Sequence, residues 1–200
     1  AVLKKITNQL KIHNTKSTLL YILNNKCSVS RYGDGELKQI ISNYSIGFQQ
    51  HNPALTRKLR EVIFNNQEAK NHIICLPYAY NSVKHMTTQA ATFWIKLSIK
   101  HNFILFRHLP KIQYYDSLCT RPYLDYRDKS KTEYFFSLWK KIWHDQNVYI
   151  IEGTHSRLGV GNNLFENVKS LKRILVPAVN AFDSYDEILS SAIKNCAKSD

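Results

Sequence analysis

The chain has 200 residues, of which 44% are hydrophobic, and carries a formal net charge of +13. This length suits one globular domain with a sizeable core, and the composition excludes a disordered chain. The excess of Lys and Arg favours anionic partners such as phosphates, nucleic acid or an anionic membrane surface, although a basic solvated surface explains it equally well. No run of five Lys or Arg residues occurs, which argues against nucleic acid as the partner.

The four cysteines and the hydropathy indicate the cellular setting. The cysteines are far apart and include no Cys-x-x-Cys pair, so neither a zinc ribbon nor a disulfide framework is expected. No apolar stretch is long enough to span a membrane. We therefore expect a cytoplasmic protein with no transmembrane segment, with peripheral attachment to a membrane as the alternative location.

Apolar spacing predicts helices that alternate with short strands along the chain. The predicted helices cover 4–25 (as one helix or two), 36–41, a segment beginning at Pro53, 87–100, 132–144 and 184–198. One predicted strand begins at Val29 and ends by Gly33, and the others cover 72–76, 147–151 and 173–176. The segment 112–118 fits either type. This alternation predicts an α/β, Rossmann-like fold with a mainly parallel sheet flanked by helices, in a single domain over 1–200.

Three polar loops follow predicted strands, and they begin at Arg31, Glu152 and Pro177. In open parallel sheets, ligands bind beyond the carboxyl ends of the strands. We therefore expect the three loops to converge on one cleft.

The first loop reads Arg-Tyr-Gly-Asp-Gly-Glu over 31–36. Two carboxylates this close together, Asp34 and Glu36, repel unless a cation or a proton lies between them. A hard divalent ion with oxygen ligands would satisfy them and leave positions for phosphate oxygens, which Arg31 would also bind. Acidic residues at a helix N-terminus are the ordinary alternative, because the helix dipole favours them there.

The second loop, 152–163, is rich in glycine and lies where a strand is expected to become a helix. Exposed backbone amides and an arginine fork suit anions, although a structural turn is the alternative. The candidate binding residues are Ser156, Arg157, Gly159, Gly161 and Asn162. The loop is not a Walker loop, because no Gly-Lys-Ser or Gly-Lys-Thr follows, and Leu164 replaces the third glycine of a dinucleotide fingerprint.

The third loop begins at Pro177 and contains Asn180 and Asp183. Both side chains suit hydrogen bonds to a sugar or a base. Capping of the last helix is the alternative role for them.

Together the loops resemble a known family. The motifs Arg-Tyr-Gly-Asp-Gly-Glu, Glu-Gly-x-x-Ser-Arg-x-Gly-x-Gly-Asn and Pro-Ala-x-Asn-Ala-Phe-Asp, spread between Ser28 and Ile188, are similar to those of bacterial glycosyltransferases of the GT-D fold. The resemblance implies a hexosyltransferase with a UDP-sugar donor, a glycan or glycoprotein acceptor and a bound Mn²⁺ or Mg²⁺. It implies that Asp34 and Glu36 hold this metal, and that Gly33 and the candidates of the other loops bind the nucleotide sugar.

Two departures from the family pattern concern the second loop and the C-terminus. The chain has Gly-Asn-Asn over 161–163 where family members usually have Gly-Asn-Asp. Family members usually continue past the last helix, so the chain is expected to be truncated at its C-terminus.

An inverting reaction would need a base for the acceptor hydroxyl, and Glu152 is the candidate, with Asp183 as the alternative. Two other functions use the same residues. One is a non-catalytic module that binds nucleotides or polyanions, and the other is a metal-dependent phosphoryl-transfer enzyme.

Overall fold

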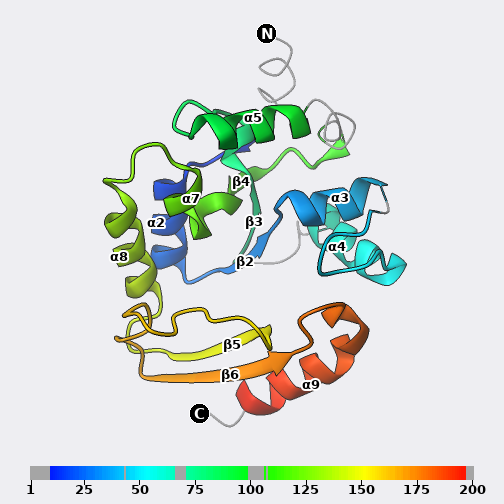
Figure 1. Ribbon diagram of the computed structural model, residues 1–200, viewed down its shortest axis with the longest axis vertical. Coiled ribbons are helices and arrows are strands. Elements are labelled where there is room, and N and C mark those ends of the chain that lie inside the picture. The colour runs from blue at the N-terminus through cyan, green and yellow to red at the C-terminus, as the bar shows by residue number, and fades with distance from the viewer. Residues whose placement is uncertain (1–9, 43, 66–70, 99–105, 107, 197–200) are drawn as a thin grey trace.

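Four parallel strands form the main sheet, in the order β1-β4-β3-β2 (Figure 1). The computed structural model describes residues 10–42, 44–65, 71–98, 106 and 108–196. The strands are β1 (Lys11–Ile12), β2 (Ser28–Arg31), β3 (His72–Leu76) and β4 (Gln113–Asp116). In register, Ser28 lies opposite His72, and Cys75 lies opposite Tyr115. Because all four strands run in the same direction, their carboxyl ends meet at one edge of the sheet.

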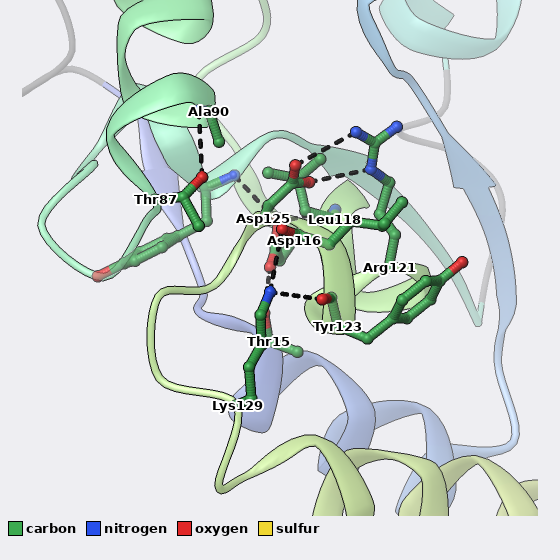
Figure 2. Close-up of polar contacts among 11 residues, drawn as sticks. Thr15, Thr87, Ala90, Asp116, Leu118, Arg121, Tyr123, Asp125 and Lys129 are labelled. Carbon is green, nitrogen blue, oxygen red and sulfur yellow. Dashed lines mark hydrogen bonds and ion pairs between the residues drawn. The ribbon is translucent and has the colours of Figure 1, made fainter.

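Helices flank this sheet (Figure 1). They are α2 (Thr15–Asn25), α3 (Asp34–Ser42), α4 (Pro53–Asn65), α5 (Thr88–Leu97), α7 (Pro122–Asp125) and α8 (Thr132–Ile142), with 3₁₀ turns η2 (Tyr78–Tyr80) and η4 (Ser117–Thr120). Side-chain caps begin two of them: Asn14 Oδ1 accepts from the Ser17 amide at 3.0 Å, and Thr87 Oγ1 accepts from the Ala90 amide at 3.3 Å (Figure 2). Such caps satisfy amides that have no partner within the helix.

The buried core lies on both faces of the main sheet. One cluster joins β3 and β4 to α3, α4 and α5; its fully buried members are Tyr32, Leu37, Ile40, Ile63, Ile74, Leu76, Met86 and Tyr114. A second cluster packs α2 against α8 through Leu19, Cys119, Phe135 and Leu138.

A separate two-stranded parallel sheet lies at the C-terminal end of the molecule (Figure 1). It consists of β5 (Asn147–Gly153) and β6 (Ser170–Val176), followed by η5 (Ala181–Ser184) and α9 (Tyr185–Cys196). The connection to α8 is fastened by hydrogen bonds from Trp143 Nε1 to the Leu164 carbonyl (3.1 Å) and from Asn167 Nδ2 to the Lys140 carbonyl (2.8 Å).

The predicted fold class is confirmed, because parallel strands are flanked by helices. The strand over 72–76 has the predicted bounds, and β5 and β6 include the other predicted runs. Two expectations are corrected. The segment 4–25 was predicted as helical, but it contains the short strand β1 before α2; its residues 4–9 lie outside the described residues. The strands form two sheets instead of one. The ambiguous segment 112–118 holds β4 and the start of η4.

The described residues form no helix that is long and apolar enough to cross a membrane. None of the four cysteines forms a disulfide in the part of the chain that the structure describes.

Candidate functional site

The first motif lies at the junction of β2 and α3. The strand ends at Arg31 and the helix begins at Asp34, so Asp34 and Glu36 belong to the first turn of a helix, and the expectation of a loop is corrected. The Gly33 amide donates to Glu36 Oε2 at 2.8 Å, which satisfies a free amide at the helix start. Asp34 Oδ2 accepts from Lys38 Nζ at 3.1 Å, one helical turn later.

Close packing at Gly33 brings Arg31 and Glu36 together. A Cβ atom on Gly33 would lie 3.1 Å from Glu36 Oε2 and 3.5 Å from Arg31 Nη1. The guanidinium and the carboxylate therefore flank the same backbone atom, and a side chain at position 33 would force one of them to move.

This junction forms one wall of a cavity of about 470 Å³ at the carboxyl edge of the main sheet. Residues 31 and 33–36 lie on one side, and the segment 44–48 lies on another. The lining is completed by Lys38 of α3, Trp94 of α5, and two residues that follow β4, Leu118 and Arg121. The volume is within the range of small-molecule sites, which is about 300–1,000 Å³.

Two cations that line the cavity, Lys38 and Arg121, were not predicted from the sequence. Asp125 binds the Arg121 guanidinium through two hydrogen bonds, from Nε to Oδ2 (2.9 Å) and from Nη2 to Oδ1 (3.2 Å), as Figure 2 shows. The Asp125 side chain is only 9% exposed, whereas that of Arg121 is 43% exposed. The sequence contained a signal for this pair: Arg121 directly precedes Pro122, which suits the start of a helix, and Asp125 follows four residues after Arg121.

Asp34 and Glu36 have the chemistry of ligands for a hard divalent cation. Glu36 Oε2 and Asp34 Oδ2 have protein partners, which leaves one oxygen of each carboxylate for a cation. Across the described ranges, no group of three or more His, Cys, Asp or Glu side chains gathers into a metal cage. Two carboxylates with substrate phosphates and water are the usual way in which proteins hold Mg²⁺, so the residues present suit such an ion.

The second loop follows the separate sheet, and none of its residues is among the described residues that line the cavity. Ser156, Arg157 and Asn162 are exposed, and Gly159 and Gly161 have left-handed φ angles of 73° and 78°. The structure thus places Ser156, Arg157 and Asn162 on the surface of the C-terminal layer.

Glu152 is buried within β5 and forms an ion pair with Arg173 of β6. The Ser156 hydroxyl and the Arg173 guanidinium hold the pKa of Glu152 below its usual value. Arg173 also donates to the Leu158 carbonyl at 2.6 Å. This arrangement fastens the two strands and the second loop together.

The third loop contacts the cavity wall. Asn180 has a left-handed backbone (φ 52°); its amide donates to the Phe48 carbonyl at 2.9 Å, and its Oδ1 accepts from the Gln50 amide at 2.8 Å. Asp183 is exposed, and Asn52 Nδ2 lies 3.5 Å from its Oδ1. The first and third motifs are therefore connected through 44–52, and Asn180 holds that segment in place.

Comparisons with known proteins agree on one family. The family described as "Glycosyltransferase GT-D fold" matches residues 29–199. The chain is 33% identical over 188 residues to "Glycosyltransferase GlyD" of Streptococcus pneumoniae and 32% identical over 181 residues to "Probable glycosyl transferase Gly" of Streptococcus gordonii. These matches cover 94% and 90% of this chain but only 23% and 26% of the two relatives, so the chain spans about a quarter of their length.

Solved structures give the same result. A domain of unknown function 1792, described as having a distinct glycosyltransferase fold, superposes with a TM-score of 0.90 at 32% identity, over 96% of this chain and 69% of the other. A protein described as a new glycosyltransferase from Streptococcus sanguinis superposes with a TM-score of 0.86 at 30% identity, over 94% and 70%.

Proposed function

Because the chain belongs to the family of glycosyltransferases with the GT-D fold, we propose that it transfers a hexose from a UDP-sugar to a glycan or glycoprotein acceptor, with a divalent cation, Mn²⁺ or Mg²⁺, as cofactor. The observation that carries this proposal is the cavity of about 470 Å³ in which Asp34 and Glu36 lie with Arg31 and Arg121. A carboxylate pair between two arginines suits a cation–diphosphate unit better than it suits either ion alone.

The cavity residues would divide the work as follows. Asp34 and Glu36 would hold the cation, and Arg31 and Arg121 would contact the diphosphate oxygens with planar, two-pronged donors. When bound, the cation would supply neutralisation of the charge that develops on the departing diphosphate. Asp125 fixes the Arg121 fork before any ligand arrives, which lowers the cost of binding.

The proton of the acceptor hydroxyl needs an acceptor group, if the reaction inverts the anomeric carbon. Glu152 is bound to Arg173 and its pKa is lowered, so it is a weak base near neutral pH. Asp183 is exposed and lies on the loop that contacts the cavity wall. Of these two candidates, we propose Asp183 as the base.

Release of UDP from a panel of UDP-sugars, measured with a mixed glycan acceptor in Mn²⁺ and in EDTA, tests the proposal. We expect release with one donor, in Mn²⁺ only. Binding of UDP without any turnover would favour the non-catalytic binding module, and release of inorganic phosphate would favour phosphoryl transfer. Equal turnover in EDTA would contradict the metal site.

A further inference from the structure

A second and larger cavity, of about 830 Å³, lies at the same edge of the main sheet. We call it the basic groove. Its walls are formed by residues that follow three strands of the sheet. Asn14 and Lys16 follow β1, and four residues follow β3: Tyr78, Ser82, Lys84 and His85. Residues 126–128 follow β4 and α7. The start of α8 closes it.

Cations dominate the groove. Four exposed basic side chains line it: Lys16, Lys84, Arg127 and Lys131. Within the described residues none of the four forms a salt bridge. Asp128 is the single acidic residue of the lining. Lys16 Nζ lies 5.8 Å from the centroid of the Tyr134 ring. A concave site with this excess of cations attracts an anionic ligand.

Aromatic rings form the floor between these cations. Four rings pack one against the next. The ring centroids of Tyr78 and His85 are 5.5 Å apart, and those of His85 and Tyr126 are 4.6 Å apart. The Tyr126 centroid lies 5.8 Å from that of Phe135. Tyr134 is 41% exposed at the rim. Such rings present flat apolar faces and polar tips, which suit the alternating CH and OH groups of a pyranose ring.

The groove is held in shape before any ligand binds. The Tyr126 hydroxyl lies 2.5 Å from Thr15 Oγ1. Thr15 Oγ1 in turn donates to the buried Asp116 carboxylate (Figure 2). The Arg127 amide donates to the His85 carbonyl at 2.9 Å. Loops that follow β1, β3 and β4 are thereby tied to one another.

The basic groove and the first cavity are neighbours on one sheet edge. Arg121 lines the first cavity and Tyr126 lines the groove, and only α7 (Pro122–Asp125) separates them in the chain. The four residues of this helix advance about 6 Å along its axis.

We propose that the basic groove binds the acceptor, and that the acceptor is a saccharide carrying a negatively charged group, either a carboxylate or a phosphate. The tyrosines stack on its sugar rings, and Lys84 and Arg127 bind its charge. The acceptor role rests on the proposed function, whereas the binding of a charged saccharide does not.

Calorimetry with three probes and no UDP-sugar tests the binding: glucuronosyl-β-1,4-glucose, its neutral counterpart cellobiose, and glucose 1-phosphate. We expect the acidic disaccharide to bind at least about tenfold more tightly than cellobiose. The glucose 1-phosphate arm shows whether the charge can be a phosphate. The double variant K84Q/R127Q should lose this preference, and the matched double variant K169Q/K194Q, which removes two exposed cations outside the groove, should keep it.

Tyr134→Ala should weaken both disaccharides alike, because it removes an exposed ring and no charge. Equal affinity for the charged and neutral disaccharides, or an unchanged preference in K84Q/R127Q, would overturn the inference. Tighter binding of single-stranded RNA than of the acidic disaccharide would overturn it in favour of a polyanion site. If the disaccharide binds as expected but no UDP-sugar is turned over, the charged-saccharide site stands and the proposed function fails.

Discussion

Asp125 accepts two hydrogen bonds from Arg121, one on each carboxylate oxygen: Nε donates to Oδ2 at 2.9 Å and Nη2 donates to Oδ1 at 3.2 Å. The carboxylate is buried, and the arginine that it holds lines the candidate donor cavity. The pair therefore links the folding of α7 to the shape of the site.

Arg121→Lys should lower kcat/KM by about tenfold to a hundredfold, because a lysine cannot bind Asp125 with two donors and contact a diphosphate as well. The measurement is steady-state UDP release. Arg127→Lys is a matched control six residues later, on the other side of α7, and should leave KM for the UDP-sugar unchanged. Equal effects of the two variants on that KM would contradict a donor-binding role for Arg121.

Asp34→Asn should reduce turnover by about a hundredfold or more, because it removes charge from the proposed cation site. Its effect on stability should be small, about 0.5 kcal/mol, since the Asp34–Lys38 pair is a partly exposed pair one turn apart. The control is Asp186→Asn, which also neutralises an acidic residue in the first turn of a helix, α9. Full turnover of Asp34→Asn in Mn²⁺ would refute the assignment of the metal site.

Much of the fold could be predicted from local patterns. The run His-Ile-Ile-Cys-Leu predicted a strand over 72–76, and β3 has the same bounds. Such β-branched and apolar residues, bounded by a proline, favour a buried strand. The two residues of β1 could not be predicted, because a strand this short leaves no alternation to detect. The division into two sheets could not be predicted either, since strand pairing depends on contacts between segments far apart in the chain.

The site was predicted only where its chemistry lies in one short motif. Asp34 and Glu36 are two residues apart in the sequence and line one cavity, so the motif identified them. The role of Arg121 depends on its hydrogen bonds to Asp125 and on the packing of η4 against α2 and β3, which are properties of the folded chain. The four cations of the basic groove come from three separate segments, and the sequence shows them only as part of the net charge.

Glu152→Gln should cost stability at neutral pH, because it replaces one member of a buried ion pair with Arg173. The pKa of Glu152 is lowered in the folded state, so its charge contributes stability above the unfolded pKa of about 4.5, and this contribution is lost as pH falls through the folded pKa. The difference in Tm between the natural chain and the variant should therefore shrink as pH falls below 4.5. A large loss of kcat with an unchanged Tm at pH 7 would instead identify Glu152 as the base.

Asp116→Asn should stabilise the chain at pH 7. Complete burial raises the pKa of Asp116 to about 6, so ionisation costs folding free energy as pH rises from the unfolded pKa near 3.8 through the folded value. A shift of about two units corresponds to about 3 kcal/mol. Asparagine keeps an oxygen for the Tyr78 and Leu118 amides and offers a donor to Thr15. Urea unfolding at pH 5 and pH 7.5 tests this, and a variant that is less stable at both pH values would contradict it.

The last prediction compares Gly159 with Gly161 in the second loop. Both have left-handed φ angles, so alanine at either position costs about 1 kcal/mol in backbone strain. A Cβ atom on Gly159 would also lie 2.4 Å from the Phe165 ring, which packs against Trp143, whereas a Cβ on Gly161 would meet no atom within 4 Å. Gly159→Ala should therefore lower Tm clearly more than Gly161→Ala. UDP affinity measured on both variants then separates packing from ligand binding: if both glycines cradle phosphate, Gly161→Ala should weaken UDP binding although its fold is nearly intact. Unchanged UDP affinity in Gly161→Ala, together with a large loss of Tm in Gly159→Ala, would identify the loop as structural.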